Sequence, residues 1–189
     1  MRLFAAVLPP EPVTAELALS VERLRALPGA DRLRWTDRAG WHFTLAFMGE
    51  VADELVAPLG ERLARAARRT DPFTLALRGG GRFDGRALWA GVGGEVAALR
   101  MLARRADAGA RRAGVVMADE RGYRPHLTLA RGRGEVDLRP YVGALAEFEG
   151  PAWEVGELAL VRSHLPGGGV AGERPRYEVV GAWDLAGRP

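Results

Sequence analysis

The sequence predicts an α+β fold made of two similar halves, and three observations support this prediction. Stretches with apolar residues at helical spacing alternate with shorter apolar stretches bounded by glycine and proline. The tetrapeptide His-x-Thr-Leu occurs twice, beginning at His42 and at His126, which lie 84 residues apart. Apolar residues make up 48% of the 189-residue chain, enough for a sizeable core, so we expect a single domain over residues 1–189.

Helices and strands can be assigned in chain order from this periodicity. Helices are expected over residues 12–27, 52–69 and 94–113, where leucine and valine recur at helical spacing, with a shorter one over 136–148. Strands are expected over residues 2–8, 32–36, 40–49, 72–83, 86–94, 125–131, 153–163 and 176–185. The glycine-rich stretch 78–85 is interpreted as a hairpin turn rather than a phosphate-binding loop.

The amino-acid composition excludes several classes of chemistry. The chain has no Cys, which excludes disulfides, cysteine-zinc sites and thiol nucleophiles. It has no Lys, which excludes a phosphate-binding loop that ends in Gly-Lys, Schiff-base catalysis and adenylated lysine intermediates. All 27 basic residues are therefore Arg, and the net charge of +3 is compatible with an acidic partner such as RNA. Many of these arginines lie on predicted helix faces, where solvated surface is the simpler explanation.

The sequence also bears on location and assembly. No apolar run reaches the length needed to cross a bilayer. The first twelve residues lack the apolar region and cleavage site of a secretory signal. We therefore expect a soluble, monomeric, cytoplasmic protein with no membrane partner.

The two His-x-Thr-Leu motifs are the candidate functional feature. Because side chains in a strand alternate between faces, His42 and Thr44 should share one face while Phe43 and Leu45 are buried. The same alternation places His126 and Thr128 on one face of the second strand. A lone histidine in a strand is usually structural, but an exact repeat of its context favours function. If the two strands lie side by side, one groove holds two imidazoles and two hydroxyls.

Such a pair of histidines suits acid–base catalysis better than metal binding. The chain has only three histidines and no His-Glu-x-x-His motif, so we expect no metal and no cofactor. One neutral imidazole can accept a proton while a charged one donates a proton, as displacement at a phosphodiester requires. The threonine hydroxyls could bind the phosphate oxygens. His164 lacks the motif and is interpreted as structural or solvent-exposed.

The residues around both motifs resemble the 2H phosphoesterase superfamily, and within it the RNA 2′,3′-cyclic phosphodiesterases, also called 2′-5′ RNA ligases. The resemblance rests on "WHFTLAFMGE" and "PHLTLAR", with support from the opening "RLFAAVLPP" and the late segment from residue 163 to 177. It implies a bilobed fold in which two pseudo-two-fold-related antiparallel sheets have helices outside and a central cleft. It also implies hydrolysis of RNA 2′,3′-cyclic phosphate ends to 2′-phosphomonoesters and, in some members, ATP-independent joining of tRNA halves.

The same resemblance assigns roles to five residues. His42 is expected to donate a proton and His126 to accept one, while Thr44, Thr128 and Arg131 bind the substrate phosphate. Strict alternation would place Arg131 on the face opposite His126, so its position depends on how regular the strand remains after Leu129.

Other features and functions remain open at this point. Trp35 and Trp41 could stack on bases but are more typical of a core, and the "GVGGEV" stretch lacks the third glycine of a dinucleotide-binding motif. The glycine loop over 166–175 could border the cleft or be plain surface. The same cleft could act on a small cyclic nucleotide or an ADP-ribose cyclic phosphate, or bind RNA without catalysis.

Overall fold

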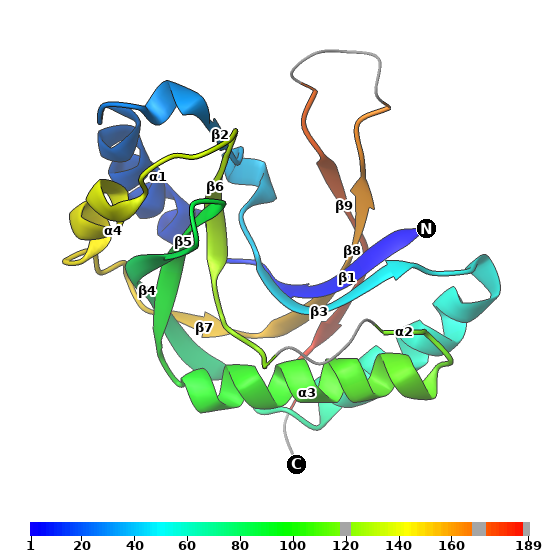
Figure 1. The fold of residues 1–189 in the computed structure, drawn as a ribbon. Coiled ribbons are helices and arrows are strands. Elements are labelled where there is room, and N and C mark those ends of the chain that lie inside the picture. Colours follow the sequence, from blue (N-terminus) through cyan, green and yellow to red (C-terminus); the bar gives the residue numbers. More distant parts are fainter. Residues whose placement is uncertain (118–121, 168–172, 187–189) are drawn as a thin grey trace.

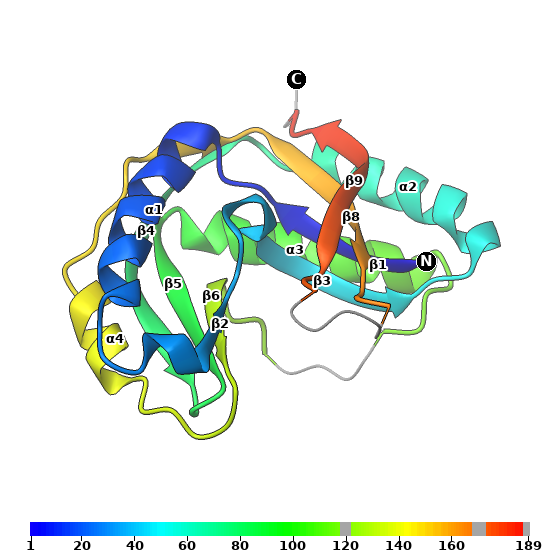
Figure 2. The same ribbon diagram turned by 90° about the horizontal axis from the view of Figure 1, so that it is seen from above.

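The computed structural model describes residues 1–117, 122–167 and 173–186. In this part of the chain a curved antiparallel sheet carries α-helices on its convex side (Figures 1 and 2). The strands are β1 Arg2–Val7, β2 Leu33–Trp35, β3 Phe43–Glu50, β4 Phe73–Phe83, β5 Ala87–Gly94, β6 Leu127–Gly132, β7 Trp153–Val155, β8 Glu157–His164 and β9 Arg176–Asp184. The helices are α1 Glu11–Arg25, α2 Asp53–Arg68, α3 Val96–Arg112 and α4 Arg139–Leu145, with short 3-10 turns at Ala30–Arg32 and Arg38–Gly40.

The α+β class and the antiparallel pairing predicted from the sequence are confirmed, but the two expected sheets are halves of one sheet. Its strand order is β7-β4-β5-β6-β3-β1-β8-β9, and β2 pairs with β6. The halves join where Phe43 of β3 pairs antiparallel with Leu127 of β6. Both side chains are fully buried. Beyond this pair β3 and β6 diverge. There β2 pairs with β6 through Leu33–Trp35.

The two halves exchange strands. In the first, β1-α1-β3-α2 is followed by β4, which pairs with β5 of the second half. In the second, β5-α3-β6-α4 is followed after β7 by β8, which pairs with β1 of the first half. Each half therefore completes its sheet with a strand supplied by the other, and the backbone hydrogen bonds of both depend on the exchange.

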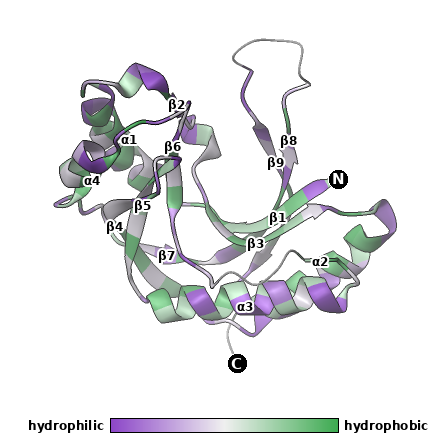
Figure 3. Cartoon of the chain, in the orientation of Figure 1, coloured by the Kyte–Doolittle hydropathy of each residue, from purple (hydrophilic) through white to green (hydrophobic). Residues whose placement is uncertain are grey.

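The helices cover the convex side in two pairs. α2 and α3 pack against each other beneath β3, β8 and β9, while α1 and α4 lie together beside β4 and β5 (Figure 1). The amphipathic pattern that predicted α3 buries Leu99, Leu102 and Ala106 and leaves arginines outside (Figure 3). In the described residues no helix combines the length and apolarity needed to cross a membrane.

Two element boundaries differ from the sequence prediction. The run Gly79–Gly81 does not form the hairpin turn; it continues β4, and the turn lies at residues 84–86. A Cβ atom at Gly81 would lie 2.3 Å from the indole of Trp89, so this strand needs glycine to let the ring pack across it. The strand expected over 153–163 is divided at Gly156, because its first part pairs with β4 and its second with β1.

The strand exchange predicts that the two halves unfold together. Leu63→Ala in α2 and Leu145→Ala in α4 each remove a fully buried side chain beneath a different half. Each should destabilise the protein by about 2–5 kcal/mol and shift one common urea transition, followed by circular dichroism and tryptophan fluorescence. Leu19→Ala, at an exposed position of α1, is the control. Two separate transitions, each sensitive to one variant, would contradict the prediction.

Candidate active site

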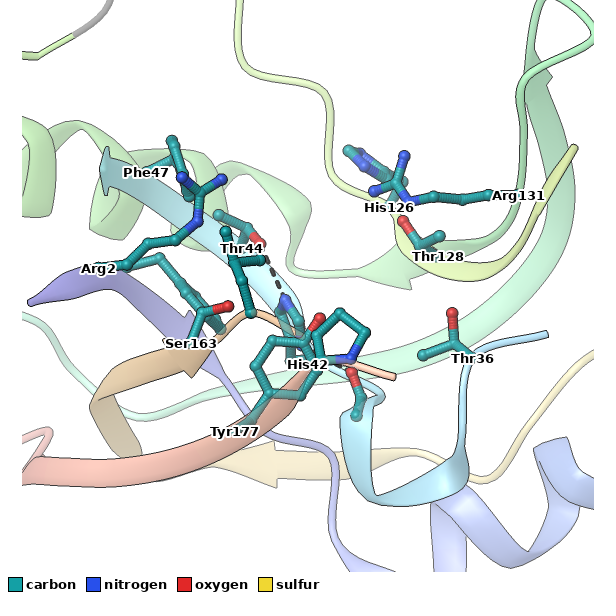
Figure 4. Close-up of a pocket in the computed structure, with 14 residues that line it drawn as sticks. Arg2, Thr36, His42, Thr44, Phe47, His126, Thr128, Arg131, Ser163 and Tyr177 are labelled. Carbon is teal, nitrogen blue, oxygen red and sulfur yellow. Dashed lines mark hydrogen bonds between the residues drawn. The ribbon is translucent and has the colours of Figure 1, made fainter. Parts of the chain in front are cut away.

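A cavity of about 380 Å³ opens on the concave side of the sheet, where β3 and β6 diverge (Figure 4). Both motif histidines and both motif threonines line it, so the structure brings together the four side chains that the repeated tetrapeptide singled out. The complete lining is Arg2, Phe4, Thr36, Gly40, His42, Thr44, Phe47, His126, Thr128, Arg131, Ser163, Leu165, Pro175 and Tyr177.

The central strand pair positions the histidines. Each histidine stands directly before its strand, and the residues after it, Phe43 and Leu127, form the antiparallel pair. In this register residue 42 stands across from 128, and residue 44 across from 126. His42 therefore faces Thr128 and His126 faces Thr44, so the two histidines lie diagonally across the strand pair, and an approximate two-fold axis passes between the strands.

Both imidazoles are held in the same tautomer. The Nδ1 atom of His42 lies 2.7 Å from the carbonyl oxygen of Gly40, and that of His126 lies 2.7 Å from the carbonyl oxygen of Arg124. A carbonyl can only accept a hydrogen bond, so each Nδ1 carries the hydrogen and each neutral ring presents a proton-accepting Nε2. The hydroxyl of Thr44 donates to the Nε2 of neutral His42 at 3.1 Å.

Each of the two central strands, β3 and β6, contains a bulge after its motif threonine. The bulge determines which of the following side chains point into the cleft. The pairing of β6 with β5 shifts register between Thr128 and Ala130, so Leu129 is an extra residue and both Leu129 and Ala130 are buried. Alternation is thereby reset, and Arg131 lies on the same side as His126. The strand therefore does not stay regular, and Arg131 reaches the cleft because of that irregularity.

β3 contains the same bulge. Its register with β1 shifts between Thr44 and Ala46, which places the exposed ring of Phe47 in the cleft at the position equivalent to Arg131. The repeat thus extends to six residues, His-x-Thr-Leu-Ala-x. The guanidinium of Arg2 lies 4.7 Å from the centre of the Phe47 ring, so each side of the cleft presents one arginine from a different strand.

Aromatic side chains flank both histidines. The ring of His42 lies 4.6 Å from that of Phe4 and 5.3 Å from that of Tyr177, between centroids. His126 lies 4.8 Å from Phe83 and 6.1 Å from Trp89. These rings exclude water from the imidazoles and hold them in place.

The same burial sets the charge state of the imidazoles. Desolvation lowers the pKa of His42 from 6.5 to about 4, against the opposing effect of its hydrogen bond to the Gly40 carbonyl; nearby His126 and Arg131 lower it further. Desolvation also lowers the pKa of His126, the Arg124 carbonyl opposes this, and Arg131 adds to the lowering. The neutral form of both rings is therefore favoured at pH 7.

The remaining residues from the sequence analysis lie elsewhere. Trp35 and Trp41 are buried in the core, and the indole N–H of Trp35 donates to the Ala30 carbonyl at 3.0 Å. His164 pairs with Glu178 at 2.9 Å on the β8–β9 ladder, outside the lining of the cleft. The "GVGGEV" stretch ends β5 and begins α3. Residues 168–172 of the glycine loop lie outside the described residues.

Sequence reasoning missed several residues that line the cleft. They are Arg2, Phe4, Thr36, Phe47, Ser163 and Tyr177. For Phe47 a signal existed, because "HFTLAF" and "HLTLAR" align over six positions. For Phe4 and Trp89 it also existed, since "LFAAV" in β1 and "LWAGV" in β5 repeat at a spacing of 85 residues. Tyr177 and Ser163 lie in the cleft because β9 pairs with β8 and β8 pairs with β1, and no local sequence pattern predicts this pairing.

Comparison with known proteins identifies the family of the chain. A model of the 2′-5′ RNA ligase superfamily matches residues 9–166. The chain therefore belongs to this superfamily, the 2H phosphoesterases that the resemblance of its motifs indicated.

The chain is also similar in sequence to individual proteins of this family. The chain is 32% identical over 185 residues to an RNA 2′,3′-cyclic phosphodiesterase of Geobacillus stearothermophilus, covering 94% of this chain but 56% of that relative, so it spans little more than half the relative's length. It is 32% identical over 205 residues to the RNA 2′,3′-cyclic phosphodiesterase of Thermus thermophilus, with 99% and 91% covered.

Solved structures agree with the fold. A crystal structure from Thermus thermophilus superposes with a TM-score of 0.78 at 29% identity over the whole of both chains. Escherichia coli LigT without ligand superposes with a TM-score of 0.75 at 28% identity, covering 97% of this chain and 96% of LigT.

The partial burial of His42 predicts a pH-dependent stability. Its pKa is near 4 in the folded protein and near 6.5 when unfolded, so between these values only the unfolded state takes up a proton. The free energy of unfolding should therefore fall as the pH is lowered from 6.5 to 4. His42→Asn should lose this part of the dependence in urea titrations, and His164→Asn should keep it. Equal slopes for both variants would contradict the prediction.

Proposed function

We propose that the protein is an RNA 2′,3′-cyclic phosphodiesterase, which opens the cyclic phosphate at an RNA end to leave a 2′-phosphomonoester. The observation that carries the proposal is the diagonal arrangement of His42 and His126, each with its Nε2 in one cleft and each across from a threonine. The names of the relatives and the 3′-AMP complex of Escherichia coli LigT, 26% identical to this chain, support RNA as the substrate class.

The proposed reaction is a displacement at phosphorus. Water attacks the phosphorus atom and gives its proton to the Nε2 of His126, the bond between phosphorus and O3′ breaks, and the Nε2 of His42 protonates O3′. The products are a 2′-phosphate and a free 3′-hydroxyl. Proton exchange with solvent then restores the starting charge of both imidazoles, so protons balance over the cycle.

The other residues of the cleft stabilise charge on the phosphate. The hydroxyls of Thr44 and Thr128 line the cleft together with both imidazoles and can donate to the non-bridging oxygens. Arg131 adds a fixed positive charge on the same side as His126. We propose that these groups need no metal ion, and in the described residues no three His, Asp or Glu side chains gather as a metal site.

The direction of proton transfer follows the family resemblance and is part of the proposal. In the empty cleft the low pKa of His42 works against its role as proton donor. A bound phosphodiester brings a negative charge beside the imidazole, which favours the charged form and raises that pKa. Substrate binding would therefore supply the proton donor that the free protein lacks.

The same chemistry extends to ligation. If a 5′-hydroxyl of a second RNA replaces water as the nucleophile, breakage of the bond to O3′ leaves a 2′-5′ phosphodiester. The bond energy comes from the strained cyclic phosphate, so no ATP and no lysine are required. We include joining of tRNA halves in the proposal on this basis.

The phosphodiesterase proposal predicts a metal-independent activity that requires both histidines. An oligoribonucleotide ending in a 2′,3′-cyclic phosphate should be converted to the 2′-phosphate in the presence of EDTA. His42→Ala and His126→Ala should each lower kcat by about 10²–10⁴-fold, as loss of a general acid or base does, while His164→Ala should leave it unchanged. Product analysis by mass spectrometry and phosphatase sensitivity distinguishes 2′- from 3′-phosphate.

Three outcomes would contradict this proposal. Activity abolished by EDTA would exclude the metal-free mechanism. Turnover of a small cyclic nucleotide or ADP-ribose cyclic phosphate but not of RNA would assign the cleft to another substrate. Tight RNA binding without turnover of any cyclic phosphate would make the protein a binding module.

Replacement of the leaving oxygen by sulfur tests which histidine is the acid. A thiolate leaves without protonation, so a substrate with sulfur at the 3′ position does not need the proton donor. If His42 is the donor, His42→Ala should regain most of its lost kcat on this substrate and His126→Ala should regain none. The opposite pattern would reverse the assignment, and recovery in neither variant would contradict separate acid and base roles.

A further inference from the structure

The cleft continues beyond the histidines into a second, larger hollow. This hollow has a volume of about 550 Å³ and shares Thr36, Gly40, Arg131, Leu165, Pro175 and Tyr177 with the first. The two are therefore one continuous groove that runs from the catalytic pair along β2 and the start of β9. A cyclic phosphate bound between the histidines leaves this part of the groove empty.

The second hollow is strongly basic. Its lining contains four arginines, Arg34, Arg131, Arg174 and Arg176, and a single carboxylate, that of Asp37. The lining thus carries a net charge of +3, as large as that of the whole chain. Arg174 is paired with Asp37. Within the described residues no ion pair or side-chain hydrogen bond engages the guanidinium groups of Arg34, Arg131 and Arg176.

Two of these arginines are held against each other by the sheet. Arg34 of β2 is the direct antiparallel partner of Arg131 of β6, so their side chains leave the sheet on the same face. Their neighbours Trp35 and Ala130 are also partners, and both are buried on the other face. Like charges directly opposite in a ladder are unfavourable. An anion between them would remove this repulsion.

We propose that the groove formed by Arg34, Arg131 and Arg176 binds the internucleotide phosphate one step upstream of the reacting end, and so selects polynucleotides over mononucleotides. Arg131 lines both hollows and would lie between the two phosphates, while Arg34 and Arg176 would contact the upstream phosphate alone. The inference rests on the proposed function, because it takes the cyclic phosphate between His42 and His126 as the fixed point. A guanidinium pair suits a phosphodiester, since each can donate two parallel hydrogen bonds to its oxygens. A cyclic mononucleotide has no second phosphate and cannot use these contacts.

The test compares a pentaribonucleotide ending in a 2′,3′-cyclic phosphate with 2′,3′-cyclic AMP. The natural protein should show a kcat/KM at least tenfold higher for the pentanucleotide. Arg34→Ala and Arg176→Ala should each lower that preference by about tenfold and flatten its dependence on salt concentration, because one phosphate contact is lost. Arg68→Ala, an exposed residue of α2 with the same change of charge, should alter neither substrate.

Two results would overturn the inference: equal kcat/KM for the two substrates in the natural protein, or variants that slow both substrates equally. Binding of a fluorescent pentaribonucleotide with a 2′-phosphate end separates this inference from the proposed function. If neither substrate turns over, weaker binding by the Arg34 and Arg176 variants than by Arg68→Ala would still support the groove. Unchanged binding would reject it.

Discussion

The antiparallel pairing of Phe43 with Leu127 is the contact on which the rest of the molecule depends. It joins the two halves of the sheet, buries two large apolar side chains at the centre, and fixes which residues face each other across the cleft. A shift of this register by one residue would turn one of the two histidines into the core and its apolar neighbour into the cleft. The fold and the geometry of the candidate site are therefore both specified by one buried strand pair.

Much of this arrangement could be predicted from local patterns. The helices, most of the strands and the face on which His42 and Thr44 lie follow from periodicity alone, because burial demands it. The repeat of the motif then identified the second histidine. Local patterns do not predict which distant strands pair with each other. Strand pairing over long sequence distances joins the two expected sheets into one and places Tyr177 beside His42.

The position of Arg131 shows where a simple rule fails and why. Strict alternation places it on the buried face, where an unpaired guanidinium would be costly. The strand instead adds Leu129 as a bulge residue, and two adjacent apolar side chains enter the core. The same Leu-Ala sequence occurs at the bulge in β3, so comparison of the two motifs beyond their first four residues shows that Phe47 and Arg131 occupy equivalent positions. The repeated motif therefore indicates the position of the Arg131 side chain better than strict alternation along the strand does.

The asymmetry between Phe47 and Arg131 has a consequence for how the cleft distinguishes the two ends of a ligand. A site with a perfect two-fold axis offers the same surroundings to a phosphodiester and to one rotated by half a turn, so it has no sense of chain direction. In this protein the axis relates the histidines and the threonines but not the residues that follow the bulges. The repeated position after the bulges, Phe47 on one side and Arg131 on the other, is therefore a source of polarity in the cleft. The repeated motif thus supplies the two histidines, and the difference at this position distinguishes one side of the cleft from the other.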